Sequence, residues 1–391
     1  MKNTKLSSLF LLWFGTAISI AEIVTGTLMA PLGWGKGITA VIIGHVIGCF
    51  LFLLPAAYLS AIQKKTAITV TGNIFGKTGV ILFSLLNAIQ LIGWTAVMIV
   101  TAQVALNSMT GKLFHFQNSV LMAIIVAALI IVWLLFNHDW LFKINNTVVI
   151  LLTIGVIIIA WIFTTKHFPM AGTFRGHISF GSAVELNVTM ALSWLPVIGD
   201  YTCQEKQPFK SSLVSVSGYF LGSSAMFILG LLTVVKTGQS NFTTALAQTN
   251  LGLVTLLIII FSTVTTTFMD AYSAATSLDN ILHRGHVNLL AILATIIGLV
   301  ISLAVSLNYY QNFLNAIGAV FTPLFAILFV SIFIIKRNLG TIINFGWWLI
   351  GVIAYSFLQR LDFVWGTTFL LLLFLLIGLL VTSLFVQRQV K

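Results

Sequence analysis

The chain has 391 residues, of which 59% are hydrophobic and only 7% are charged. Its apolar runs repeatedly reach the roughly 20 residues that cross about 30 Å of hydrocarbon, which predicts a polytopic membrane protein. The net charge of +11 arises from basic residues scattered singly at the ends of apolar segments, without the clustered basic face of a protein that binds nucleic acid. Cys49 and Cys203 show no CxxC or Cys/His spacing, so neither a disulfide framework nor a zinc site is expected.

Twelve membrane-spanning helices are predicted, which gives an all-α membrane protein. The loops on the predicted inner side hold most of the lysines and arginines, including Lys64, Lys65, Lys336 and Arg337, so we expect both termini in the cytoplasm. No proline-rich, serine-rich or highly charged linker interrupts the chain, and residues 1–391 are expected to form one membrane domain. The predicted helices lie at about 8–31, 37–62, 79–108, 118–136, 143–163, 179–201, 209–236, 250–281, 287–306, 311–335, 341–358 and 364–386.

The first predicted helix is unusually polar for a membrane span. Residues 13–34, WFGTAISIAEIVTGTLMAPLGW, place Glu22 among small hydroxyl residues at membrane depth and continue into Gly26 and Pro31. Such residues are typical of a membrane helix whose backbone unwinds around a ligand or an ion. The sequence therefore predicts a discontinuous helix with its acid at a functional site.

The sixth predicted helix is the only other span of comparable polarity. Its sequence, FGSAVELNVTMALSWLPVIGDY, carries Glu185, Asn187 and Pro196. Because four regular helices separate the two interrupted ones, we expect two five-helix halves in opposite topology, with substrate at the midplane where the interruptions meet. The expected inverted repeats span about 8–163 and 179–335, and two peripheral helices follow at about 341–386.

The third predicted helix carries a polar and aromatic face. Asn87, Gln90 and Trp94 lie at positions i, i+3 and i+7, so they project from one side. A tryptophan beside two amides can stack on a flat ring and supply hydrogen bonds around its edge. The alternative is a helix seam, in which amides bond across helices and the ring packs. Trp194 in the sixth helix offers a second aromatic face, although lipid or core packing would also explain it.

Hydroxyl residues form a stripe along the eighth predicted helix. In FSTVTTTFMDAYSAATS, the side chains of Ser262, Thr265, Thr266, Asp270 and Ser273 follow one side. Hard cations such as Na⁺ take oxygen ligands, and these hydroxyls can join carbonyls that an unwound neighbouring helix leaves free. The alternative is that they bond back to their own helix backbone. The density of the stripe favours a cation site.

Glu22 is the single residue to which the sequence points most directly. A carboxylate accepts two parallel hydrogen bonds, which suits an aminopyrimidine whose exocyclic amine and protonated ring nitrogen both present N–H groups. The alternative is a structural or proton-carrying acid that stays neutral when unoccupied. His45 in the second helix is interpreted as a packed, hydrogen-bonded histidine in preference to a proton relay.

The chain resembles the nucleobase:cation symporter family, which includes cytosine permeases and hydantoin transporters. The resemblance is carried by ISIAEIVTGTLMAPLG, AVIIGHVIGCFL, FGKTGVILFSLLNAIQLIGWTAV and STVTTTFMDAY, in that order. APLGW, GHVIG and NAIQLIGWTAV together are similar to the subgroup regarded as transporters of the thiamine precursor hydroxymethylpyrimidine. The resemblance implies a LeuT-like fold of ten core helices in two inverted repeats plus two peripheral helices, and symport of Na⁺ or H⁺ by alternating access.

The resemblance also implies roles for individual residues. Trp94 matches a third-helix tryptophan that stacks on the base, and Ser193 and Trp194 match a serine and an aromatic residue of the sixth helix. Gln90 lies four residues before its tryptophan, whereas the glutamine of the cytosine permease pattern lies three before. Thr267 takes the place of a substrate-binding asparagine. The residues expected to bind substrate are Glu22, Asn87, Gln90, Trp94, Ser193, Trp194 and Thr267, and those expected to bind the cation are Gly15, Ile18, Ser262, Thr265 and Thr266.

The function expected from these features is cation-coupled import of a small pyrimidine across a bacterial inner membrane. Hydroxymethylpyrimidine is the first candidate for this pyrimidine. A cytosine, purine or other nucleobase permease is the alternative. Since no HExxH motif or nucleophile elbow occurs, an enzyme is not expected. The expected partners are the pyrimidine and membrane lipid, with no cofactor besides the coupling ion, Na⁺ or H⁺.

Overall fold

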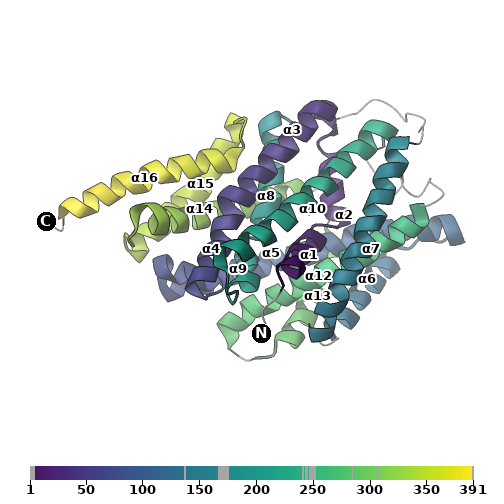
Figure 1. Ribbon diagram of the computed structural model, residues 1–391, viewed down its shortest axis with the longest axis horizontal. Helices are drawn as coiled ribbons and strands as arrows, with labels where there is room; N and C mark the ends of the chain where they lie inside the picture. The colour runs from purple at the N-terminus through teal and green to yellow at the C-terminus, as the bar shows by residue number, and fades with distance from the viewer. Residues whose placement is uncertain are drawn as a thin grey trace.

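The chain folds into a bundle of long helices, shown as a computed structural model in Figure 1. The structure describes residues 5–135, 138–165, 176–239, 242, 245, 252–283, 285–305 and 309–389, and all regular structure within these ranges is helical. The helices are α1 (Leu6–Thr16), α2 (Ile20–Thr27), α3 (Gly33–Val46), α4 (Leu54–Gln63), α5 (Ala67–Phe114), α6 (Ser119–Leu135), α7 (His138–Thr165), α8 (Phe180–Leu192), α9 (Leu195–Thr202), α10 (Pro208–Thr237), α12 (Gly252–Leu282), α13 (Val287–Ala304), α14 (Tyr310–Phe329), α15 (Thr341–Leu358) and α16 (Thr367–Gln389).

These helices confirm the twelve predicted spans in their predicted order. The first span consists of α1 and α2, and the sixth consists of α8 and α9. A π-helical segment, Ile47–Leu53, joins α3 to α4 in the second span, and another, Val330–Ile335, extends α14 in the tenth. Within the described residues, eight helical segments are long and apolar enough to cross a membrane, and shorter apolar helices lie at Leu6–Thr16, Ser119–Leu135 and Val149–Thr165.

Both predicted helix interruptions are present, but the first does not lie at its glycine or its proline. The first span breaks over Ala17, Ile18 and Ser19, between α1 and α2, and Ser19 caps the new helix by accepting a hydrogen bond from the backbone N–H of Glu22. Pro31 lies beyond α2, in the short 3₁₀ helix Ala30–Leu32. The second half of the broken span, α2, therefore begins at a serine that caps it.

The second interruption lies at Ser193 and Trp194, between α8 and α9. Pro196 occupies the first turn of α9. Proline suits this position because its missing N–H would have no partner inside the helix anyway. The proline therefore starts the second half-helix.

Glycines set the distance between α10 and the broken first span. A Cβ atom on Gly26 of α2 would lie 2.1 Å from the carbonyl oxygen of Phe227, and one on Gly230 of α10 would lie 2.0 Å from the carbonyl oxygen of Ile23. The two backbones can approach this closely only because neither glycine has a side chain. This close contact places Glu22 against α10.

We expect Gly26→Ala to lower the melting temperature of the purified transporter. The added methyl group has no space beside Phe227, and overpacking of this kind costs about 1–3 kcal/mol. Gly346→Ala is the matched control, because no atom lies within 4 Å of the Cβ that it would add to α15. Equal melting temperatures for the two variants would contradict the close contact between α2 and α10.

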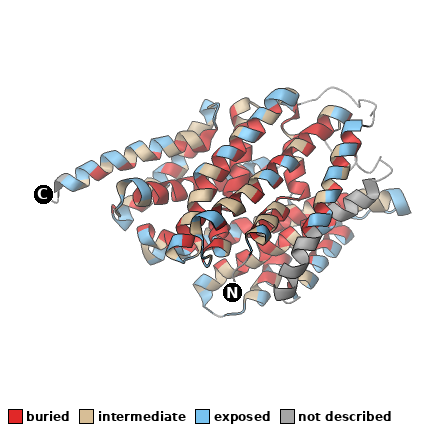
Figure 2. Cartoon of the chain, viewed as in Figure 1, coloured by how far each residue is buried: buried red, intermediate tan, exposed pale blue. Residues whose placement is uncertain are grey.

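The last two helices lie at the periphery, as expected. Figure 1 shows α14, α15 and α16 together on one side, with the C-terminal end of α16 projecting from the bundle. Figure 2 shows that buried residues concentrate in the central helices, whereas α16 is largely exposed. The two broken spans lie inside the bundle, because 94% of the apolar window in Phe180–Thr202 is buried and α2 packs against α10.

Candidate functional site

The break in the first span faces hydroxyl groups of α12. Ser262 Oγ donates a hydrogen bond to the carbonyl oxygen of Ile18, and Thr266 Oγ1 donates to that of Thr16 at 3.5 Å. Both carbonyls belong to the turn where α1 ends, so no helical neighbour takes them. Freed carbonyls and hydroxyls thus lie together, as the hydroxyl stripe predicted.

Two other predicted cation ligands lie differently. Thr265 Oγ1 donates to the carbonyl oxygen of Ser262 at 2.8 Å, within its own helix, whereas the hydroxyl of Thr263 accepts from the backbone N–H of Ile20 at 3.5 Å. Thr263, which was not among the predicted ligands, therefore faces the break while Thr265 bonds to its own helix. The carbonyl oxygen of Gly15 accepts from the N–H of Ile18 at 3.0 Å.

The chemistry of this donor set fits a hard monovalent cation. It consists of hydroxyl and carbonyl oxygens, which are the ligands such ions take. Among the described residues, no group of three or more His, Cys, Asp or Glu could hold a metal ion.

A side chain of the third span forms a hydrogen bond to the break in the sixth span. Gln90 Nε2 donates to the carbonyl oxygen of Ser193 and to Asn87 Oδ1, both at 2.9 Å. Asn87 Nδ2 in turn donates to Ser277 Oγ of α12 at 2.8 Å. The amide oxygen of Gln90 is buried and has no hydrogen-bond partner among the described residues, so it can accept a bond from a ligand.

Trp94 and Trp194 lie next to the two ends of the hydrogen bond between Gln90 and Ser193. Gln90 lies one turn before Trp94 and bonds to the carbonyl of Ser193, the residue before Trp194. Trp94 meets Tyr310 and Phe313 edge-on, with ring centroids 6.0 and 5.5 Å apart. Its indole N–H is buried and has no partner among the described residues.

Aromatic residues that the sequence did not indicate complete the wall around Trp194. Trp13 of α1 meets Trp194 edge-on at 5.6 Å, and Tyr219 of α10 lies 6.2 Å from Trp194. Tyr310 Oη bonds to Thr25 Oγ1 at 2.8 Å, which connects α14 to α2. Trp13 begins the stretch that the sequence did single out, but its apolar surroundings resemble those of any core tryptophan, so no pattern distinguished it.

Ser193 and Thr267 are buried near this region but turn their hydroxyls to their own helices. Ser193 Oγ donates to the carbonyl oxygen of Met190 at 2.6 Å, and Thr267 Oγ1 donates to that of Thr263 at 2.5 Å. Ser193 therefore takes part in the break through its backbone carbonyl, which accepts from Gln90.

Glu22 lies in a buried polar cluster with α10. Its carboxylate accepts from Tyr219 Oη at 3.0 Å and from Ser223 Oγ at 2.6 Å. His45 Nε2 lies 2.6 Å from the same Ser223 oxygen. Each carboxylate oxygen accepts one of these bonds and has a second lone pair, so Glu22 can keep both hydroxyl partners and still accept from a further donor.

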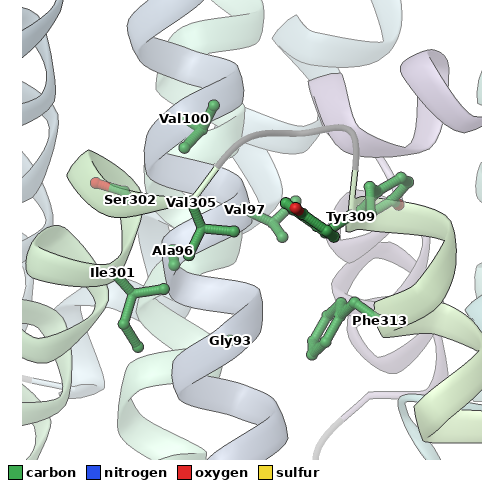
Figure 3. A pocket seen from close by; sticks show the side chains of 10 residues that line it. Gly93, Ala96, Val97, Val100, Ile301, Ser302, Val305, Tyr309 and Phe313 are labelled. Carbon is green, nitrogen blue, oxygen red and sulfur yellow. The ribbon is translucent and has the colours of Figure 1, made fainter.

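A hollow of about 120 Å³ lies beside Trp94, between α5, α13 and the start of α14 (Figure 3). Its lining is almost entirely apolar. Tyr310 and Phe313 line it and also contact Trp94, so these two rings lie between the hollow and the Trp94 indole. In Figure 3 the ring of Phe313 lies beside Gly93, whose missing side chain leaves room for it.

The fold is that of the LeuT-type secondary transporters. It is similar to Mhp1, a nucleobase-cation-symport-1 family transporter, in a closed conformation with bromovinylhydantoin bound, at 18% identity over 98% of this chain and 92% of that chain, with a TM-score of 0.75. Inward-facing Mhp1 matches at 17% identity over 97% and 90% of the chains, with a TM-score of 0.71. A substrate-bound, outward-open Na⁺-coupled sialic acid symporter matches at 14% identity over 97% and 88%, with a TM-score of 0.67.

Residues 2–346 match the family described as permeases for cytosine/purines, uracil, thiamine and allantoin. The chain belongs to this permease family. No curated protein matches the chain at a significant level. The family confirms the expectation of a transporter and not an enzyme, and the matching folds confirm the LeuT-like architecture.

Proposed function

We propose that this chain is a cation-coupled importer of a small pyrimidine that works by alternating access, and that hydroxymethylpyrimidine is the first candidate substrate. The observation that carries the proposal is the bridge from Gln90 to the carbonyl of Ser193. It joins the third helix, which carries Trp94, to the break in the sixth, which carries Trp194. The likeness to a hydantoin-bound transporter supports a planar nitrogen heterocycle as the cargo.

The residues would share the work of recognition. Trp94 and Trp194 would hold the ring by stacking, which contributes about 0.5–1.5 kcal/mol for each aromatic pair beyond buried area. The free amide oxygen of Gln90 and the amide of Asn87 would read the polar edge. Ser193 would contribute its backbone, Thr267 would accept through its hydroxyl oxygen, and Glu22 would accept from the ring on lone pairs that Tyr219 and Ser223 leave free.

The coupling ion would bind at the break in the first span. Carbonyls near Gly15 and Ile18, with the hydroxyls of Ser262, Thr265 and Thr266, form the proposed Na⁺ site, and a rotation of Thr265 away from its own helix would complete it. A substrate and an ion that both bind beside the same interrupted helices favour the same conformation, and this shared preference couples them. We place the protein in a bacterial inner membrane with both termini in the cytoplasm, from the bias of basic residues toward those loops.

Uptake into proteoliposomes tests the proposal. We expect labelled hydroxymethylpyrimidine to accumulate when a sodium gradient is imposed and to stop when the gradient is collapsed. Unlabelled cytosine, uracil, adenine and thiamine are added as competitors in parallel experiments, because the family includes permeases for such compounds. Stronger competition by cytosine or a purine would overturn hydroxymethylpyrimidine as the substrate in favour of the nucleobase alternative, and accumulation without any cation gradient would overturn symport.

A further inference from the structure

The polar cluster around Glu22 has fewer hydrogens than its contacts require. Ser223 Oγ lies 2.6 Å from Glu22 Oε2 and 2.6 Å from His45 Nε2. Both distances are short hydrogen bonds, and each needs a hydrogen between its heavy atoms. The hydroxyl of Ser223 has only one hydrogen, so the second must come from Glu22 or His45.

The other nitrogen of His45 determines what the imidazole can supply. His45 Nδ1 lies 2.9 Å from the backbone carbonyl oxygen of Val41, which can only accept, so Nδ1 carries a hydrogen. A neutral His45 then presents a bare lone pair at Nε2. If Glu22 were also ionised, one of the two short contacts of Ser223 would join two acceptors with no hydrogen between them.

We propose that Glu22, Ser223 and His45 form a proton-binding site that holds one proton at membrane depth. The proton is either on the carboxyl group, which then donates to Ser223 while Ser223 donates to His45, or on Nε2 of His45, with both hydrogen bonds reversed. In either arrangement every short contact has its hydrogen and the cluster is electrically neutral. Loss of the proton leaves a net negative charge in a buried apolar setting, which is costly.

A second buried acid, Glu185, has a donor hydrogen for each of its hydrogen bonds without an added proton. Glu185 Oε1 accepts from Tyr355 Oη at 2.6 Å and from Thr368 Oγ1 at 2.7 Å, and Oε2 accepts from the backbone N–H of Thr368 at 2.8 Å. Each contact has its own donor hydrogen. The cluster around Glu22 differs because a base, His45, lies at its far end.

Tyr219 connects the proton site to Trp194. Its one hydroxyl hydrogen is shared between Glu22 Oε1 at 3.0 Å and the carbonyl oxygen of Met190 at 3.3 Å, at the end of α8. Hydrogen bonds to an ionised carboxylate are roughly twice as strong as neutral ones, so loss of the proton draws this hydroxyl toward Glu22. Because the Tyr219 ring contacts Trp194, the proton influences the substrate-binding wall.

Other titratable groups near the cluster do not supply the missing hydrogen. The Cys49 thiol is buried, and Tyr310 Oη bonds to Thr25 Oγ1 at 2.8 Å. The rings of Phe220 and Phe227 pack against His45. Glu185 of α8 bonds to Tyr355 and Thr368, and Oδ2 of Asp270 on α12 has no hydrogen-bond partner among the described residues.

Infrared difference spectra of the purified transporter in lipid, in H₂O and D₂O at neutral pH, test the proposal. Wild type minus Glu22→Gln and wild type minus His45→Gln should contain a deuterium-sensitive band of a protonated carboxylic acid or of an imidazolium ring. Wild type minus Glu185→Gln is the matched control, because this buried acid has no histidine in its cluster and its difference spectrum should contain no imidazolium band. An ionised carboxylate together with a neutral imidazole in the first two differences would overturn the proposal.

Glu22→Gln also tests the connection to substrate. The glutamine amide can donate to Ser223 and its oxygen can accept from Tyr219, so the variant imitates the proton-bound site and should fold. We expect substrate affinity to change at least severalfold across the titration of the site in wild type and to be independent of pH in Glu22→Gln; equal pH dependence in both would overturn the connection. This part rests on the proposed function, whereas the spectra are recorded without substrate and test the proton site separately.

Discussion

Trp94→Ala is expected to weaken substrate binding by about thirtyfold or more, because an aromatic anchor in a desolvated pocket typically contributes about 2 kcal/mol. Trp94 is buried, and it lies one turn from Gln90, whose amide holds the break in the sixth span. Trp94→Phe should recover most of the affinity, since it retains a stacking face. The measurement is the quenching of intrinsic fluorescence, or equilibrium binding of labelled substrate, for purified variants.

Trp161→Ala is the matched control for this prediction. Trp161 lies on α7 with 61% of its side chain exposed, in the surface expected to face lipid, so its removal should leave binding unchanged. Equal affinities for Trp94→Ala and wild type, with the control behaving as expected, would remove the third helix from the proposed substrate site. A lower melting temperature alone would not account for a selective loss of affinity at Trp94.

Side-chain periodicity predicted which residues share a helix face. It was informative where the arrangement depends on a single helix. Asn87, Gln90 and Trp94 were expected on one side of the third span, and the structure connects Gln90 to both Asn87 and the break at Ser193. The interruptions were also predictable, since polar side chains at membrane depth require partners that unwound backbone can supply. The position of the first break depended on Ser19, a capping residue with a weaker signal than glycine or proline.

The contacts between helices were not predictable from the same pattern. The rotation of one helix against another depends on close packing, and Gly26 and Gly230 set that packing between α2 and α10. Without this contact the sequence could not pair Glu22 with Ser223, and it therefore assigned the acid to the substrate. The sequence likewise indicated the hydroxyl stripe on the eighth helix. It did not indicate that Thr263 faces the break while Thr265 bonds to its own helix, because this depends on how the eighth helix is rotated against the first.

We expect Ser262→Ala and Thr266→Ala each to raise the sodium concentration that half-saturates uptake by about tenfold to hundredfold, because a bond to a charged group contributes about 1.5–3 kcal/mol. Their hydroxyls bond to the carbonyls of Ile18 and Thr16, and each removal deletes one oxygen beside the break. Uptake at saturating sodium should be little changed. The measurement is initial uptake rate against sodium concentration, with potassium as the replacement ion.

Thr295→Ala provides the control, since the Thr295 hydroxyl is buried and bonds to the carbonyl of Ala291 in its own helix at 2.9 Å, away from the break. Thermodynamic linkage adds a stricter requirement. Sodium must raise the affinity for substrate by the same factor as substrate raises the affinity for sodium. We expect Ser262→Ala to reduce both factors equally. An unchanged factor in Ser262→Ala would show that the coupling ion binds elsewhere. Thr263→Ala and Thr265→Ala then decide which hydroxyl faces the ion, because only the variant that removes a ligand should shift the sodium dependence.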